Sequence, residues 1–400
     1  MKSALQKTKL LFVSALLAIV GSAVSTNHAD SKFAYFDRQR TGLTYGFIDK
    51  TGRFIIPPKF SKASSFDATG IALVEIKSTA DKNWYTSKLI DTNGRMAPGS
   101  DEIDVLSLPK QSLAVCRWKD KAESSKKPLR KGFTYCTADG KIFKRDFQSA
   151  EDFGEGLAIA TTGGLTGFVH SDETFQPIQT LTGCDALGAF ADGVAPVRQH
   201  GKSGYIDKRG NWHIEPIFRD AQVFSKGLAR VQHMFSAGSI VDHRLLPNSI
   251  RWGLIDTKGK WVVTPCYLEI GPLKEGLQYF RDGDLMGFMD ETGKIAIPAK
   301  YSQAGSFSEG LAPVCLQDSR TLVFIDRTGK IILSRDLKDP VRITDEWPTF
   351  RQGLCAMYQK YKSESRWGFI DKKNQWKIKP MFNEVKSFSG KYAVAGVKSR

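Results

Sequence analysis

The sequence has few cysteines, and no two of them are close together. Its 400 residues include six cysteines, widely spaced and without any C-x-x-C motif. This spacing excludes the usual structural zinc and thioredoxin-type sites. Cys116 and Cys136 are the candidate disulfide that we single out, because both lie in strand-like stretches that flank one polar connection. The alternative is that the cysteines are small, buried core residues.

The sequence also lacks the motifs of common catalytic sites. None of its six histidines belongs to an H-E-x-x-H motif. The G-K-S at 201–203 has Pro196 where a phosphate-binding loop requires its first glycine, and it leads into a predicted strand. The segment around Ser308 is not G-x-S-x-G. We therefore expect a protein that is not an enzyme, with no catalytic, metal-binding or cofactor-binding residues and no cofactor. The histidines that gather in the middle copies of the repeat described below keep one alternative open, a hydrolase; they are His170, His200, His213, His233 and His243.

Long apolar runs are missing except near the N-terminus. There, Lys2, Lys7 and Lys9 precede an apolar stretch at residues 10–20, which is followed by small residues. This pattern is typical of a secretory signal peptide, which we assign to residues 1–25, with a leader at 26–44. The stretch is too short to span a bilayer, and no later run is apolar enough. We expect an exported protein, periplasmic or secreted, without a transmembrane span.

Acidic residues are outnumbered by basic ones. The chain has 58 lysines and arginines against 42 aspartates and glutamates, a formal charge of +16. This excess favours an anionic partner, such as an acidic glycan, a lipid headgroup or an acidic protein, although an ordinary soluble surface is the alternative. We expect no nucleic-acid partner, because the protein is expected to be exported and no nucleic-acid motif is present. The oligomeric state stays open.

What the sequence does contain is a repeat. The stretch YGFIDKTGRFIIPPKF at 45–60 recurs from residues 203, 252, 286 and 367. Fainter copies begin at 88, 131, 166 and 322, which gives nine copies over residues 45–398. Self-similarity at a period of a few tens of residues indicates a repeat architecture. Insertions between copies are expected to fall in loops on one side of the array.

Each copy contains the signals of short strands and tight turns. Aromatic and β-branched residues before the aspartate and after the glycine predict two strands, and F-S-x-G-L-A-x-V predicts a third. The aspartate is expected to accept backbone hydrogen bonds and the glycine to take a positive φ, in a structural turn and not a calcium site. These turn residues are Asp49, Gly52, Asp207, Gly210, Asp256, Gly259, Asp290, Gly293, Asp326 and Gly329. Helical periodicity is absent, so the sequence predicts an all-β fold.

The recurring W/Y-G-F-I-D-x-x-G pattern resembles the WG repeat, a β-rich repeat found mainly in bacterial proteins. The W-G dipeptide itself occurs at Trp252–Gly253 and Trp367–Gly368. The resemblance covers nearly all of residues 45–398. It implies an interaction or envelope-associated protein, and no shared catalytic motif comes with it.

From these observations we expect tandem repeats of short antiparallel strands in a curved, solenoid-like array of about nine units. A closed β-propeller is the alternative, but nine units exceed the usual four to eight blades and no closure signal is visible. The function that we expect is an exported, non-enzymatic repeat scaffold that binds a protein or an anionic envelope polymer. The alternatives are a structural cell-envelope protein and a hydrolase with its site in the central divergent repeats.

Overall fold

The computed structural model describes residues 42–77, 85–97, 103–119, 132–236, 239–241, 244–246, 249–317, 321–336, 347–361 and 364–398. All of them belong to the second of two compact units, Arg40–Arg400. The expected signal peptide and most of the expected leader lie outside the described residues. Among the described residues, no helix has the length and apolar character needed to cross a bilayer.

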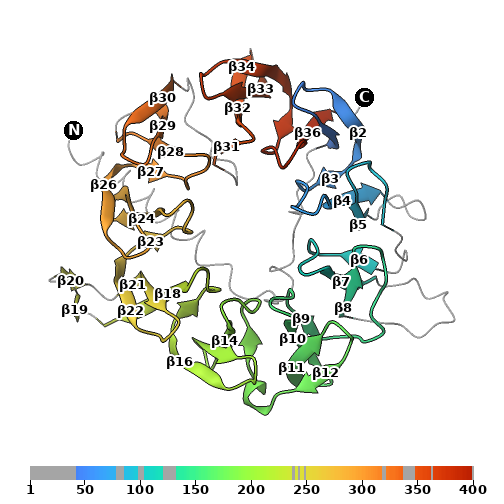
Figure 1. The fold of residues 1–400 in the computed structure, drawn as a ribbon, viewed down its shortest axis with the longest axis vertical. Helices are drawn as coiled ribbons and strands as arrows, with labels where there is room; N and C mark the ends of the chain where they lie inside the picture. Colours follow the sequence, from blue (N-terminus) through green and yellow to red (C-terminus); the bar gives the residue numbers. More distant parts are fainter. Residues whose placement is uncertain are drawn as a thin grey trace, which may run out of the picture. The chain divides into compact units, whose positions relative to one another are not determined.

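The described strands form nine antiparallel sheets that follow one another around a ring (Figure 1). We call these sheets blades and number them in chain order from the blade that contains β1. Blade 1 contains β35 (Glu384–Val385), β36 (Ala393–Lys398), β1 (Leu43–Ile48) and β2 (Phe54–Phe60), and blade 2 contains β3 (Lys62–Ala63), β4 (Ala72–Lys77) and β5 (Tyr85–Ile90). Blade 3 contains β6 (Ile103–Val105), β7 (Leu113–Trp118) and β8 (Phe133–Thr137). Blade 4 contains β9 (Ser149–Ala150), β10 (Leu157–Thr162), β11 (Leu165–His170) and β12 (Phe175–Pro177).

The remaining five blades each have four strands. Blade 5 contains β13 (Asp185–Ala186), β14 (Val194–Gln199), β15 (Lys202–Asp207) and β16 (Trp212–Phe218), and blade 6 contains β17 (Asp220–Ala221), β18 (Leu228–Phe235), β21 (Ser249–Asp256) and β22 (Trp261–Tyr267). Blade 7 contains β23 (Glu269–Ile270), β24 (Gln278–Asp282), β25 (Leu285–Met289) and β26 (Ile295–Tyr301), and blade 8 contains β27 (Gln303–Ala304), β28 (Ala312–Cys315), β29 (Thr321–Ile325) and β30 (Ile331–Asp336). Blade 9 contains β31 (Phe350–Arg351), β32 (Leu354–Tyr361), β33 (Glu364–Asp371) and β34 (Trp376–Phe382). Outside the blades lie a hairpin of β19 (Ser239–Val241) and β20 (Arg244–Leu246) and one 3-10 turn, η1 (Gln179–Leu181).

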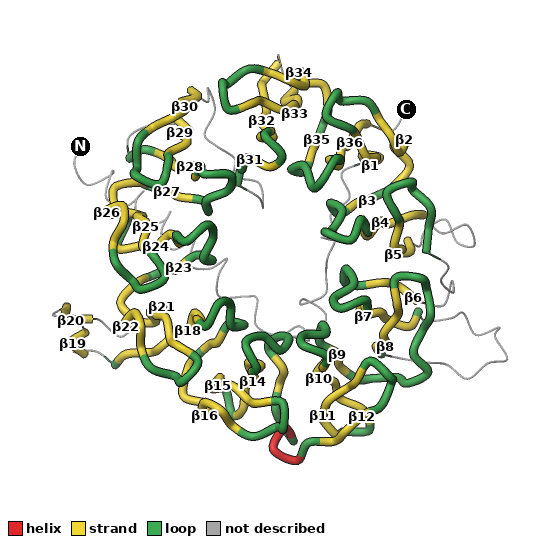
Figure 2. Tube along the Cα trace, viewed as in Figure 1, coloured by secondary structure: helices red, strands yellow, loops and turns green. Residues whose placement is uncertain are grey.

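Each copy of the sequence repeat is shared between two neighbouring blades. The first copy supplies β1 and β2 to blade 1 and then β3 and β4 to blade 2. The chain therefore leaves the outer strand of one blade and enters the short inner strand of the next, as Figure 2 shows around the ring. Each of the five clear copies thus gives four strands and not three, because a two-residue strand follows the aromatic residue that ends its outer strand.

The prediction of an open, solenoid-like array is wrong, because the blades close into a nine-bladed β-propeller. β36 near the C-terminus pairs with β1 near the N-terminus in unbroken antiparallel register, from Leu43 with Lys398 to Ile48 with Ala393. The first copy begins with the two outer strands of a blade, and the last copy ends with the two inner strands of that same blade. An open array would leave both edges unpaired, and closure removes them.

Aromatic residues join each blade to the next. The phenylalanine of F-S-x-G packs on the aromatic residue of the preceding blade's third strand, as for Phe66 on Phe47 with ring centroids 4.5 Å apart. The same contact recurs between Phe224 and Tyr205, at 4.7 Å. Burial of each ring contributes about 2–3 kcal/mol, and each aromatic pair adds about 1 kcal/mol. The hydrophobic core is therefore a set of clusters between blades.

The glycine of the W-G dipeptide is required where the outer strand passes close to the third strand. A Cβ atom built on Gly368 would lie 2.4 Å from the backbone oxygen of Ile378. The register between β33 and β34 is irregular at this point. Only glycine leaves room for the bulged outer strand.

Candidate functional site

The two ends of the ring differ in how their strands are connected. In an antiparallel blade the connections alternate, so the first-to-second and third-to-fourth connections share one end, which we call the turn end. The opposite end, which we call the loop end, holds the second-to-third connections. In the four-stranded blades the third-to-fourth connections have four or five residues, whereas second-to-third connections range from two residues at 200–201 to fourteen at 119–132. Length variation between copies is therefore greatest at the loop end.

At the turn end, the aspartates of the repeat accept hydrogen bonds from their own turns. Asp49 Oδ1 accepts from the backbone N–H of Thr51 at 2.8 Å and of Arg53 at 3.1 Å. The Gly52 N–H donates to the Asp49 carbonyl oxygen at 3.0 Å, and Gly52 has a φ of +86°. The hydrogen bond from the Thr51 hydroxyl, with those from the backbone, lowers the pKa of the Asp49 carboxyl. The pattern recurs at Asp207, Asp256, Asp290 and Asp326, with Gly210, Gly259, Gly293 and Gly329 at positive φ.

The turn glycine also contacts the preceding blade. A Cβ atom on Gly52 would lie 2.9 Å from the Ile378 side chain, and one on Gly293 would lie 2.4 Å from that of Val263. Each glycine therefore serves its own turn and the packing of two blades. The sequence gives no direct signal for this second role, because the contact depends on the ring.

The inner turns form a second layer of contacts, which sequence reasoning missed. The residue before glycine in F-S-x-G has a positive φ near 50°, as in Glu155, Glu275 and Glu309, and the following glycine is also positive. Two such residues in a row make the type I′ turn of a two-residue hairpin. The residue before the glycine is acidic in several copies, and this repeated acid was the available signal.

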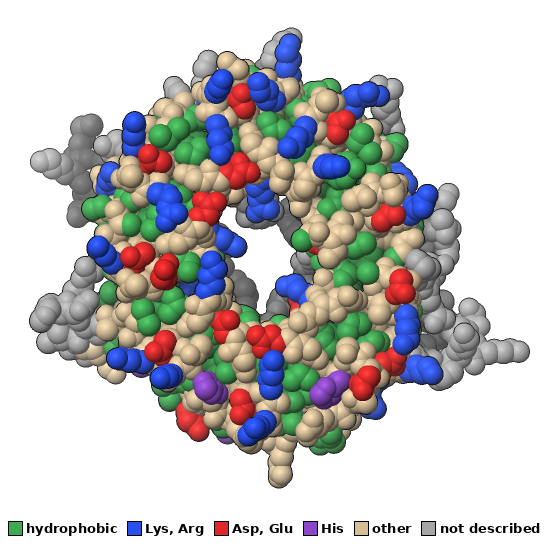
Figure 3. Space-filling model, viewed as in Figure 1, with side chains coloured by type: hydrophobic (Ala, Val, Ile, Leu, Met, Phe, Trp, Pro, Cys, Tyr) green, Lys and Arg blue, Asp and Glu red, His purple; other side chains and the backbone are tan. Residues whose placement is uncertain are grey.

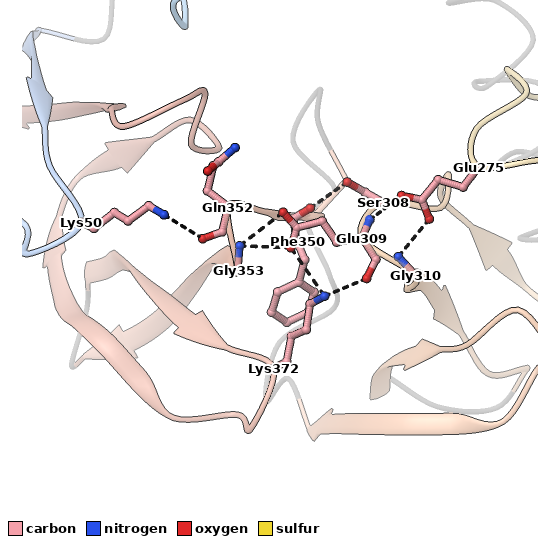
Figure 4. Close-up of polar contacts among 9 residues, drawn as sticks. All are labelled: Lys50, Glu275, Ser308, Glu309, Gly310, Phe350, Gln352, Gly353 and Lys372. Atoms are coloured by element: carbon pink, nitrogen blue, oxygen red, sulfur yellow. Dashed lines mark hydrogen bonds and ion pairs between the residues drawn. The ribbon is translucent and has the colours of Figure 1, made fainter.

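The acidic side chains of these inner turns bind the backbone of the next blade. Glu275 accepts from the N–H groups of Glu309 at 2.6 Å and Gly310 at 2.9 Å, and Glu309 accepts from the Gly353 N–H at 3.0 Å (Figure 4). Glu155 accepts from the Gly193 N–H at 3.1 Å in the same way. A chain of side-chain contacts therefore links neighbouring blades near the central opening.

Lysines of the outer turns complete this network. Lys208 Nζ lies 2.9 Å from Glu155 Oε2 of the preceding blade, and this contact, with the Gly193 N–H, lowers the pKa of the Glu155 carboxyl. Lys372 Nζ donates to the Glu309 carbonyl oxygen at 2.8 Å (Figure 4). The glutamates of the inner turns that we describe are thus used to join blades.

The described histidines lie on separate elements. His170 ends β11, His200 lies between β14 and β15, His213 is on β16 and His233 is on β18. His213 Nε2 is 2.6 Å from the Thr257 carbonyl oxygen, and the His233 ring packs on Phe235 and Trp261. No hydrogen bond or ring contact joins two of these four, and His243 lies outside the described residues. The described residues contain no group of three potential metal ligands.

The candidate disulfide lies in blade 3. All six cysteines are free thiols in the structure, and the Sγ atoms of Cys116 and Cys136 are 2.8 Å apart. The two residues are diagonal neighbours on β7 and β8, because Cys116 is opposite Thr134 and Cys136 is opposite Ala114. Burial raises the pKa of the Cys116 thiol. Their pairing stays a prediction. Cys136 also lines a cavity of about 20 Å³ between blades 2 and 3, room for about one water.

Comparison with solved structures gives only weak likenesses. A eukaryotic initiation factor is 9% identical, with 71% of this chain and 80% of that chain covered and a TM-score of 0.43. AztD from Citrobacter koseri is 12% identical, with 90% and 100% covered and a TM-score of 0.36. A streptogramin B lyase is 12% identical, with 88% and 97% covered and a TM-score of 0.32. At these scores the likeness supports no conclusion about this chain.

No curated protein matches the chain. The model of the WG containing repeat matches residues 45–78, 204–233, 252–284, 286–318 and 367–398. These are the five copies in which the repeat is clearest in the sequence. The chain is therefore a WG repeat protein, with the repeat matched at five places.

Proposed function

We propose that the protein is an exported, non-enzymatic scaffold that binds a protein or an anionic polymer, in the periplasm or outside the cell. The observation that carries this proposal is the contrast between the two ends of the ring. The turn end uses inner-turn glutamates and turn glycines to hold blades together, whereas the loop end presents connections of very different length on that frame. Variable connections on a fixed scaffold are a common arrangement for recognition. The N-terminal sequence pattern and the positive net charge support export and an anionic ligand.

The proposal is tested by ligand capture with the mature chain. The immobilised protein is exposed to an envelope extract and, separately, to labelled dextran sulfate or uncharged dextran, at about 50 mM and about 500 mM NaCl, conditions that change electrostatic screening several-fold. We expect retention of a protein or of dextran sulfate at low salt and release at high salt. If neither an extract protein nor dextran sulfate is retained at low salt, the proposed function is wrong.

A further inference from the structure

Charge is unevenly distributed around the ring. Blades 9 and 1, over residues 347–361, 364–398 and 42–60, contain thirteen lysines and arginines against four acidic residues; we call this the basic sector. Blades 4 and 5, residues 149–218, contain nine acidic residues against four lysines and arginines; we call this the acidic sector. The two sectors lie on opposite sides of the ring (Figure 1). On the face drawn in Figure 3, Lys and Arg side chains are numerous over the basic sector, whereas acidic and basic side chains are mixed over the acidic sector.

Equivalent positions show how the two sectors differ. Ile378 of β34 and Ile214 of β16 hold the same place in the register of their blades, opposite Phe369 and Tyr205. The next residue is exposed in both blades, and it is Lys379 in blade 9 but Glu215 in blade 5. The repeat therefore keeps its core position and changes the sign of the charge beside it.

The exposed lysines of the basic sector lie together on the outer strands. Lys377 and Lys379 alternate on the solvent face of β34, roughly 7 Å apart. Phe54 of β2 contacts Phe382 of β34 with ring centroids 5.8 Å apart, which brings the two outer strands together. Exposed apolar residues lie among these lysines, namely Ile55 at 47% and Met381 at 57% exposure. We call Lys373, Lys377, Lys379, Met381, Ile55 and Lys59 the rim patch.

Most cations of the rim patch are unpaired within the described chain. Lys377 forms an ion pair with Asp371 at 3.2 Å. Lys373, Lys379 and Lys59 form no ion pair with a described carboxylate, and the Lys59 Nζ lies over the Phe60 ring at 5.3 Å. These three ammonium groups are exposed and available to an external anion.

We propose that the rim patch is the binding site for an anionic polymer, a chain that bears repeated sulfate, phosphate or carboxylate groups. This inference rests on the proposed function and gives that function a location. A row of lysines at strand spacing contacts successive anionic groups, and Ile55 and Met381 contact the less polar backbone of the polymer. Exposed charges attract such a ligand over about 10 Å at moderate salt.

The acidic sector of a second copy of the chain is a less suitable ligand for the rim patch, because many of its carboxylates already form ion pairs or hydrogen bonds. Glu155 binds Lys208 and the Gly193 N–H, and Asp192 accepts from the Gly227 N–H at 2.7 Å. Asp207 and Asp172 accept hydrogen bonds within their own turns. A flexible polyanion, in contrast, keeps its charges free for the lysines of the patch.

The test compares two triple variants that remove equal charge. The patch variant is Lys59→Gln, Lys373→Gln and Lys379→Gln, and the control is Lys300→Gln, Lys258→Gln and Lys294→Gln in blades 6 and 7. Lys300 is the positional equivalent of Lys59 and lies over Tyr301 at the same 5.3 Å. Lys258 is the equivalent of Lys373 in its turn. Binding of labelled dextran sulfate is measured by fluorescence anisotropy at about 50 mM NaCl, and the thermal unfolding of each variant confirms that it is folded.

We expect the patch variant to bind dextran sulfate roughly tenfold more weakly, since each exposed charge contact contributes a factor of about two to three. The control variant should lose less than about twofold. Equal losses in both variants would show diffuse attraction and overturn the proposal. The proposal would also be overturned if the patch variant bound dextran sulfate as tightly as the wild type but lost concentration-dependent sedimentation. That result would identify a second copy of the chain as the ligand of the rim patch. If the wild-type chain ignores dextran sulfate but retains an extract protein, this inference fails while the proposed function stands.

Discussion

The turn end and the loop end of the ring are built from the same repeat but obey different constraints. At the turn end, Gly52 must fit beside Ile378 of the preceding blade, and Glu309 must reach the Gly353 N–H of the following one. At the loop end, the connection between β10 and β11 has two residues, and the one between β7 and β8 has fourteen. The difference teaches that contacts between blades, and not the turns themselves, fix the form of the repeat. Connection length varies most at the end of the ring that carries none of these described contacts.

The largest effect is expected from opening the ring. Deletion of residues 384–398 removes β35 and β36, so that β1 loses one of its two partner strands and the core around Phe47 is exposed to water. Since that core includes residues that are fully buried, such as Val394, we expect a loss of more than about 5 kcal/mol and no cooperative unfolding transition. Circular dichroism during heating measures this.

The matched change at the loop end should be nearly silent. Replacement of residues 78–84 between β4 and β5 by Asn-Gly shortens a connection to the length found at 200–201. Loop closure depends weakly on length, so we expect the free energy of unfolding to change by less than about 1 kcal/mol. A loss comparable to that of the opened ring would show that the two ends are equally constrained and would break the comparison.

A moderate effect is expected from Gly52→Val at the turn end. Valine is strained at a φ of +86°, and its Cβ would also lie 2.9 Å from the Ile378 side chain. The two effects together should cost about 3 kcal/mol. The control is Gly193→Val, which has a φ of +85° but no atom within 4 Å of the added Cβ, and it should cost about 1–2 kcal/mol. Urea unfolding midpoints compare the two, and equal losses would rule out a packing role for Gly52.

The strands were predictable from the sequence because their signals are local. Alternating aromatic and β-branched residues on either side of Asp49 and Gly52 specify a hairpin without reference to any neighbour. Closure was not predicted, because it depends on how the first and last copies fit together. The signal was nevertheless present: the array begins with the third strand of a blade, at Tyr45, and ends with the second strand, at Lys398.

The candidate site shows the same division between local and long-range information. The aspartate turns follow from local spacing, and the structure places their hydrogen bonds within each turn. The contact between Glu155 and Gly193 joins residues 38 positions apart and appears only once blades are neighbours. The opposite charges of Lys379 and Glu215 are likewise informative only when the register of both blades shows that the two positions are equivalent. Equivalent positions in a repeat become informative when the structure aligns them.

The smallest effect is expected from Glu155→Gln, which tests the inter-blade network through pH. The Lys208 ammonium and the Gly193 N–H lower the pKa of Glu155 in the folded state. A depressed folded-state pKa adds stability above the unfolded value of about 4.3, and this contribution is lost as the pH falls through the folded value. Because the pair is partly exposed, we expect less than about 1 kcal/mol. Urea unfolding from about pH 6 to about pH 3 should therefore show a smaller loss of stability in Glu155→Gln than in the wild type. Glu215→Gln, in the following blade and with no described ion pair, should keep the wild-type profile. Identical profiles for Glu155→Gln and the wild type would mean that the ion pair of Glu155 with Lys208 adds no stability and that packing alone holds the turn end together.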